Sequence, residues 1–188
     1  MTTTNKITLA RIALIPFFIW FAMQGTPEGD IIALVLFCVA SVTDFLDGYV
    51  ARKYNQVTDF GKFVDPLADK LLVTAALVIF VERGLFAAWM VFVILAREFI
   101  ITSLRNVAAA KGQVMAAAWS GKVKTCVQIA AIIGLFLFSI VSGMGTALPT
   151  ALAQVCAWSA TLITLYSGYD YMYRNWALVA EGATKPKA

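Results

Sequence analysis

Residues 44–70 read DFLDGYVARKYNQVTDFGKFVDPLADK, and this stretch decides which fold the chain can adopt. Its skeleton is Asp44-x2-Asp47-Gly48-x2-Ala51-Arg52-x8-Gly61-x3-Asp65-x3-Asp69. At about 100° per residue, the first two aspartates share one helix face with a glycine and an alanine, so a bulky ligand could approach the backbone there. The last two, at i and i+4, share one face of the next helix. Packed together, the two faces would bring four carboxylates into one cavity.

The sequence on either side of this stretch is strongly apolar. Hydrophobic residues make up 61% of the 188 residues and charged residues 14%, against about 45–50% and about 25% in an ordinary soluble domain. Lipid is therefore the expected solvent. A membrane-spanning helix needs about 20 mostly apolar residues, and six segments fit: Ile7–Met23, Ile31–Val50, Lys70–Val81 extended back toward Gly61, Leu85–Leu104, Val123–Val141 and Thr150–Tyr169. The sequence predicts an all-α integral membrane protein with six transmembrane helices.

The chain shows no internal repeat and no linker long enough to separate domains. We therefore expect one membrane domain over residues 1–188, with residues 1–6 as an interfacial lead-in. Residues 180–188, which contain Pro, Gly and Lys, are expected to form a flexible tail.

Basic residues predict the orientation of these helices, because cytoplasmic loops collect Lys and Arg. With six spans both termini share one side of the membrane, and that side holds all 15 basic residues except Arg83 and Arg97. The prediction is an N-in, C-in protein whose polar active-site cavity, built on residues 44–69, opens at the cytoplasmic side.

The clustered aspartates are costly in such a place. An Asp at the centre of a membrane helix costs about 2.5–3.5 kcal/mol, and four anions also repel one another. Acids exposed to interfacial water would be the structural alternative, but intramembrane acids are usually functional. The chain has no histidine, so any metal must be held by carboxylates, which favours Mg²⁺ or Mn²⁺. Two such ions would balance four carboxylates and could clamp a diphosphate.

The pattern DxxDGxxARx8GxxxDxxxD resembles the signature of the CDP-alcohol phosphatidyltransferase family, with every position present. Residues 5–11, NKITLAR, are similar to the family's first helix. The strings GKFVDPLADKLLV, AREFIITSLRNVAAAKG and SGKVKTCVQ resemble the bacterial branch that makes phosphatidylglycerol phosphate. The likeness covers about Asn5–Ala130.

This resemblance implies a reaction and residue roles. CDP-diacylglycerol and glycerol 3-phosphate would be the substrates, with attack at the β-phosphorus and release of CMP. Three aspartates (Asp44, Asp47 and Asp65) would hold the metals, while Asp69 would share a metal or act as the general base. The nucleotide pocket would be lined by Gly48, Ala51, Arg52 and Gly61. A homodimer in the bacterial inner membrane, in contact with membrane lipids and with no nucleic-acid partner, is also implied.

The acceptor phosphate calls for basic residues near the cytoplasmic ends of the later helices. Arg105, Lys122 and Lys124 are the candidates, because cationic side chains bind phosphate strongly. They could instead obey the positive-inside rule or contact anionic headgroups. Deeper in a span, Arg97 and Glu98 are expected to pair or to make a helix–helix contact, or Glu98 could orient a pocket residue.

Other functions stay open at this point. Relatives in the same family could use phosphatidylglycerol, inositol phosphate or serine as the acceptor. A membrane prenyltransferase also holds a metal diphosphate between aspartates, but the Gly-x-x-Ala-Arg segment would have no obvious role in one. A cation or proton transporter is less favoured, because transporters tend to show internal repeats and midplane sites.

Overall fold

The computed structural model describes residues 3–54, 59–110, 119–145 and 150–176; within them, the side chains of residues 3–7, 44–54, 59–66, 69 and 110 lie outside the description. The described ranges hold six α-helices and no strand: α1 (Thr3–Met23), α2 (Pro27–Tyr54), α3 (Asp59–Glu82), α4 (Ala88–Ala110), α5 (Trp119–Gly143) and α6 (Thr150–Arg174). Each of the six predicted segments is confirmed as a helix. The predicted lead-in is continuous with α1 from Thr3 onward, while residues 180–188 lie outside the described part.

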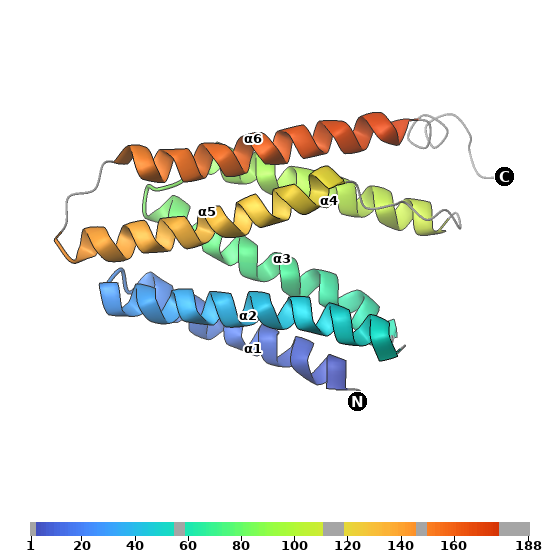
Figure 1. The fold of residues 1–188 in the computed structure, drawn as a ribbon, viewed down its shortest axis with the longest axis horizontal. Helices are drawn as coiled ribbons and strands as arrows, with labels where there is room; N and C mark the ends of the chain where they lie inside the picture. The colour runs from blue at the N-terminus through green and yellow to red at the C-terminus, as the bar shows by residue number, and fades with distance from the viewer. Residues whose placement is uncertain (1–2, 55–58, 111–118, 146–149, 177–188) are drawn as a thin grey trace.

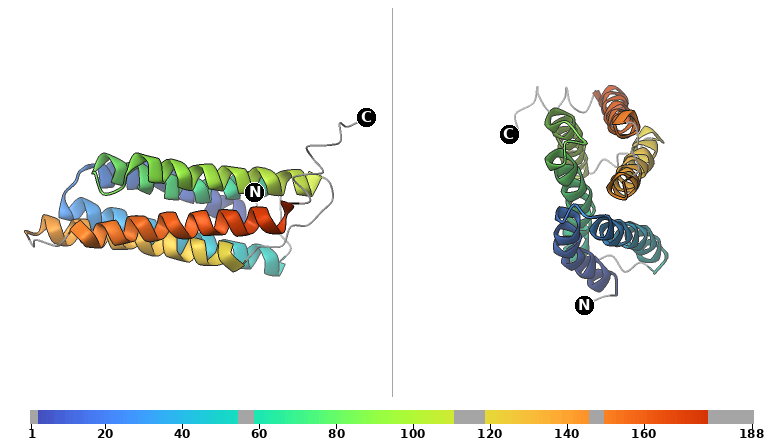
Figure 2. Two further views of the ribbon diagram at one scale, coloured as in Figure 1. Left: turned by 90° about the horizontal axis from the view of Figure 1, so that it is seen from above. Right: turned by 90° about the vertical axis from the view of Figure 1, so that its left-hand side faces the viewer.

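The helices run along the long axis of the molecule as an elongated bundle (Figure 1). Helix α1 packs against α2 and α3, and α5 packs against α6 and α2, while α4 packs against α6. Seen from the end of the bundle, α3 and α4 form one side, with α5 and α6 beside them (Figure 2). Because α3 also contacts α4 and α5, it joins the N-terminal and C-terminal halves.

Helices α1, α3 and α5 end in the same way. Each helix is followed, two residues after its last residue, by a glycine with positive φ: Gly25, Gly84 and Gly145, at 63°, 70° and 86°. Glycine adopts this left-handed conformation without steric cost and is the usual residue just past a helix end. Helix α2 then begins at Pro27 with the Thr26 hydroxyl accepting a hydrogen bond from Gly29 N at 3.1 Å, as expected of an N-cap followed by proline.

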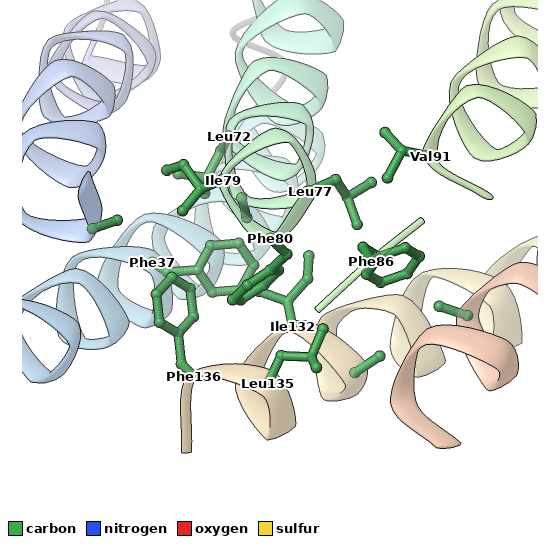
Figure 3. Close-up of a cluster of buried hydrophobic side chains, with 14 of the residues drawn as sticks. Phe37, Leu72, Leu77, Ile79, Phe80, Phe86, Val91, Ile132, Leu135 and Phe136 are labelled. Atoms are coloured by element: carbon green, nitrogen blue, oxygen red, sulfur yellow. The ribbon is translucent and has the colours of Figure 1, made fainter. Parts of the chain in front are cut away.

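Four buried phenylalanines form the centre of the core. Phe18 of α1, Phe37 of α2, Phe80 of α3 and Phe136 of α5 are each fully buried, and three of them are labelled with their neighbours in Figure 3. Ring centroids lie 6.1 Å apart for Phe18–Phe37, 5.9 Å for Phe18–Phe136 and 4.8 Å for Phe80–Phe136. Tilted and edge-to-face pairs of this kind add to the stabilisation from apolar burial. The cluster therefore helps to hold α1, α2, α3 and α5 together.

The outer surface is also apolar. Every helix exposes large hydrophobic side chains, for example Phe17, Val35, Val78, Phe92, Leu137 and Leu162. By length and composition, one helix in the described part of the chain could cross a membrane, α5 (Trp119–Gly143), with a mean hydropathy of 2.2; α1 adds a shorter apolar segment, Thr8–Met23. The six helices are thus established, whereas six membrane crossings stay a prediction.

Candidate functional site

A cavity of about 270 Å³ lies between the helices of the bundle. Five helices contribute to its wall, and its polar lining residues include Arg11 of α1, Ser41 of α2, Lys70 of α3, Glu98 of α4, and Lys124 and Gln128 of α5. Apolar residues such as Ile94 and Ile129 complete the wall. A mostly apolar cavity with a few converging polar groups is the usual form of a ligand site.

The described charges around the cavity are predominantly positive. Arg11 and Lys124 are 2% and 5% exposed, and Lys70 is partly buried. Against these three cations stands one described carboxylate in the lining, that of Glu98. Because buried cations are poorly screened by water, these side chains interact strongly with any carboxylate or phosphate close to them.

Two residues of helix α4 bind the side chains of Lys70 and Lys124. The Glu98 carboxylate forms an ion pair with Lys124, 2.6 Å between Oε1 and Nζ. One turn later, the Thr102 hydroxyl accepts a hydrogen bond from Lys70 Nζ and donates one to the carbonyl of Glu98 at 2.7 Å. Residues at i and i+4 share a helix face. One face of α4 therefore holds the two lysines in place at the cavity wall.

Arg97 extends this network to α6. Its Nη1 donates to Glu98 Oε1 at 2.9 Å, and its Nη2 donates to Ser167 Oγ at 2.6 Å. A Cβ added to Gly168 of α6 would lie 3.0 Å from Arg97 Cγ, so the glycine allows this close approach. Mutual pairing and a helix–helix contact, the two roles favoured from the sequence, are both confirmed. Glu98 also holds a cavity residue, which was the alternative.

The eight residues predicted to bind metal and nucleotide lie in α2 and α3, but their side chains are outside the described part: Asp44, Asp47, Gly48, Ala51, Arg52, Gly61, Asp65 and Asp69. The backbone is helical at all eight positions. Ala40, Ser41 and Val73 line the cavity. Asp44 follows Ala40 and Ser41 by about one helical turn, and Asp69 precedes Val73 by one turn. On the helix backbone, Asp44 and Asp69 are therefore each about one turn away from residues that line the cavity.

Among the side chains that are described, no three potential metal ligands come together. The side chains of the four signature aspartates are outside that described set, and the ligand atoms that they could offer are all carboxylate oxygens. Hard divalent cations such as Mg²⁺ and Mn²⁺ prefer this donor set. The residue types thus fit the predicted ions, and the ligand geometry stays a prediction.

The three predicted acceptor-binding residues occupy different places. Lys124 lines the cavity, whereas Lys122 is exposed and neither it nor Arg105 is among the described lining residues. Arg105 is also exposed; its Nε donates to the Tyr171 hydroxyl at 3.0 Å, and its guanidinium lies 5.4 Å from the ring centroid. Their roles in binding stay predictions, but Lys124 alone among the three is placed at the cavity.

The start of α5 is tied to the end of α6 close to these residues. Ser120 Oγ donates to Asp170 Oδ2 at 2.5 Å, and Arg174 Nε donates to Oδ1 at 2.6 Å. Asp170 lies beyond the predicted span Thr150–Tyr169. The hydrogen bonds from Ser120 and Arg174 stabilise the carboxylate and thereby hold the pKa of Asp170 below its usual range. The hydrogen bond between Ser120 and Asp170 thus ties the first turn of α5, which precedes Lys124, to α6.

Three cavity residues were missed as site residues from the sequence: Arg11, Lys70 and Gln128. The sequence pattern placed both Lys70 and Arg11 only among the basic residues of the cytoplasmic side. The available signal was a charged residue inside an apolar run, which membranes disfavour unless it is functional. Gln128 lies in a run of apolar residues of α5, and the same signal, in weaker form, could have found it.

Known proteins are similar to this chain over most of its length. The model of the CDP-alcohol phosphatidyltransferase family matches residues 1–166. This chain belongs to the CDP-alcohol phosphatidyltransferase family. The resemblance predicted from the aspartate signature is thereby confirmed, and it extends further toward the C-terminus than the quoted strings.

Individual members of the family are similar over nearly the full length. The CDP-diacylglycerol–glycerol-3-phosphate 3-phosphatidyltransferase of Bacillus subtilis is 47% identical over 92% of this chain and 94% of its own. Proteins of the same name from Rickettsia bellii and Sodalis glossinidius are 37% and 36% identical, each over 89% of this chain and 91% of their own. The family-model match over residues 1–166 spans the cavity-forming helices α1 to α5.

Proposed function

We propose that this protein transfers the phosphatidyl group of CDP-diacylglycerol to sn-glycerol 3-phosphate. In this reaction the primary hydroxyl oxygen of the acceptor bonds to the β-phosphorus of the nucleotide lipid. The bond from that phosphorus to the oxygen of CMP breaks, and CMP leaves. The products are phosphatidylglycerol phosphate and CMP, and the hydroxyl proton goes to a base.

The observation that carries this proposal is the cavity with basic lining residues. Helices α2 and α3, which hold the four aspartates, form part of its wall. Glycerol 3-phosphate carries about two negative charges near neutral pH, and its phosphate would suit the ammonium groups of Lys70 and Lys124. Arg11 adds a buried guanidinium, which can donate to two phosphate oxygens at once. Serine, an acceptor used elsewhere in the family, carries no phosphate that would call for three cations. The names of the similar proteins favour the same acceptor.

The reacting groups would come from α2 and α3. Asp44, Asp47 and Asp65 would hold two divalent cations, Mg²⁺ or Mn²⁺, with Asp69 completing the set or acting as the general base. Such ions, when bound, stabilise negative charge on a diphosphate. An alcohol is a poor nucleophile at neutral pH, so a carboxylate near the acceptor hydroxyl is needed to accept its proton. Gly48, Ala51, Arg52 and Gly61 would line the nucleotide pocket.

The surroundings of the site are proposed to be the cytoplasmic membrane of a bacterium. Apolar side chains exposed on all six helices support burial in lipid, and the distribution of Lys and Arg supports cytoplasmic termini. In this arrangement both a membrane-bound donor and a water-soluble acceptor can reach the cavity. A homodimer is part of the proposal because the family resemblance implies one.

The test is CMP release by the purified protein in detergent. CDP-diacylglycerol, Mg²⁺ and one acceptor at a time are supplied: glycerol 3-phosphate, inositol phosphate, serine or phosphatidylglycerol. We expect release with glycerol 3-phosphate only. A chelator should stop the release, and added Mg²⁺ or Mn²⁺ should restore it.

The Asp69→Asn variant should lower the rate by about 10²–10⁴-fold, the usual contribution of a general base. Asp59, which lies outside the signature, provides the matched control, and Asp59→Asn should retain most of the activity. Release with a different acceptor alone would contradict the proposed acceptor. No release with any of the four, from well-folded protein, would contradict the proposed reaction.

A further inference from the structure

Gln128 is a buried amide at the cavity wall that the proposed reaction does not yet use. It lies on α5, is 3% exposed, and lines the cavity with Lys124, one helical turn earlier. Its Nε2 has no hydrogen-bond partner in the described part of the protein. A donor buried in this way without a partner destabilises the folded protein. Native proteins seldom leave such a group unpaired without a reason.

Three other polar side chains at this wall have partners within the protein. Lys70 donates to Thr102, and Lys124 pairs with Glu98. Thr125, also on α5, donates to the Gly121 carbonyl at 3.1 Å. Gln128 differs from these three residues, because its Nε2 is buried at the cavity and has no hydrogen-bond partner among the described protein groups.

We propose that Gln128 is a specificity-determining residue that donates a hydrogen bond from Nε2 to the secondary hydroxyl of the bound acceptor. The inference rests on the proposed function, since it deepens the description of the same cavity. Lys124 and Gln128 are at i and i+4, so they share a helix face and lie about 6 Å apart along its axis. The ammonium binds the phosphate end of the acceptor, and the neutral amide binds the hydroxyl beside it.

The chemistry of the two groups supports this division. A cationic donor is suited to phosphate oxygens, and a neutral amide to an uncharged hydroxyl. A site built to pair with a substrate hydroxyl also discriminates strongly against an analogue that lacks it, because the buried donor is then left unpaired. Gln128 would thus select a polyol phosphate over a simple alkanol phosphate.

The experiment compares two acceptors in two variants. Glycerol 3-phosphate carries the secondary hydroxyl, and 3-hydroxypropyl phosphate lacks it while keeping the reacting primary hydroxyl and the phosphate. Gln128→Leu removes the amide at similar volume. Gln154→Leu makes the same change on α6, where Gln154 is exposed, and serves as the matched control. The KM of each acceptor is measured by CMP release from full-length protein in detergent.

We expect Gln128→Leu to raise the KM for glycerol 3-phosphate by about 3–10-fold, the value of one neutral hydrogen bond. The KM for 3-hydroxypropyl phosphate should change less than about twofold, and Gln154→Leu should change neither. Equal effects on the two acceptors, or no effect on either, would overturn the proposal.

Thermal stability gives a second measurement that does not depend on turnover. Replacing an unpaired buried amide with an apolar side chain should leave the Tm of the ligand-free protein unchanged or raise it. Glycerol 3-phosphate should stabilise wild-type protein more than Gln128→Leu protein at equal concentration. A large fall in the Tm of the ligand-free variant would instead assign Gln128 a structural role. Should Gln128→Leu not fold, Gln128→Met makes the same comparison.

These outcomes are distinct from failure of the proposed function. If wild-type protein releases no CMP with glycerol 3-phosphate, the proposed acceptor is wrong whatever Gln128 does. If wild-type protein uses glycerol 3-phosphate and the two acceptors respond alike to Gln128→Leu, the reaction stands and the role of Gln128 is wrong.

Discussion

Glu98 of α4 and Lys124 of α5 form an ion pair at the cavity wall, 2.6 Å between Oε1 and Nζ, with the lysine side chain only 6% exposed. The same Glu98 oxygen also accepts from Arg97, which reaches Ser167 on α6. The position of a cavity lysine is thus set by three helices. A mutation on α4 or α6 can therefore alter the cavity without touching its ligand.

Removing the carboxylate at Glu98 should weaken both the fold and the site. Loss of one partner from a fully buried ion pair costs about 3–5 kcal/mol; because Glu98 is 20% exposed, we expect Glu98→Gln to cost about 1–3 kcal/mol. For a chain of this length, the Tm should fall by about 2–4 °C per kcal/mol.

A double variant separates the two effects of Glu98. In Glu98→Gln with Lys124→Met, most of the lost Tm should return, because apolar replacement of a buried pair is often neutral. CMP release should stay low, since the cationic group is absent. Recovery of activity along with the Tm would contradict a binding role for Lys124.

Lys124 and Lys122 provide a test of placement, since they are two residues apart on one helix. Lys124→Ala should raise the KM for glycerol 3-phosphate by about 10–100-fold, the value of one charged hydrogen bond. Lys122→Ala should change this KM by less than about twofold, because Lys122 is exposed. Steady-state kinetics decide the matter, and a larger effect at Lys122 would place the acceptor outside the described cavity.

A second polar cluster, at the end of the bundle with the α1–α2 and α3–α4 connections, should matter for stability alone. Arg83 pairs with Asp30, which is 1% exposed, at 2.6 Å, and also donates to Ser139 and to the Ala22 carbonyl. Arg83→Met would leave a buried carboxylate without its cation, at a cost of about 3–5 kcal/mol.

The Tm of the purified variant measures this cost. Glu82→Gln is the neighbouring control; Glu82 is exposed, and the change should stay within about 0.5 kcal/mol. In the folded fraction of Arg83→Met protein, the acceptor KM should equal that of wild type. A raised KM would show that this cluster also shapes the cavity.

The proposed orientation can be tested with single cysteines. Cys38, Cys126 and Cys156 are first replaced by Ala, and Gln24→Cys or Trp176→Cys is then introduced; both positions are exposed, at opposite ends of the bundle. A membrane-impermeant maleimide should label Gln24→Cys in intact cells. It should label Trp176→Cys only after the membrane is opened. The reverse pattern would contradict cytoplasmic termini.

Much of this protein could be predicted from its sequence because the signals involved are local. Long apolar runs between turn residues predict helices, and all six were found. The glycines after α1, α3 and α5 mark their ends through a backbone conformation that depends on the residue itself. The aspartate signature depends on spacing along two helices, and it sufficed to indicate the family.

Only the tertiary structure decided which basic residues share a cavity. Lys122 and Lys124 are separated by about 200° around their helix axis, so no more than one of them can face a given neighbour. Helical periodicity assigns residues to faces but does not say which face meets which helix. The contact of α4 with α5 through Glu98 selects Lys124, and the packing of α1 and α3 brings in Arg11 and Lys70. The unpaired amide of Gln128 likewise becomes visible only once its neighbours are in place, because burial and pairing are properties of the packed helices.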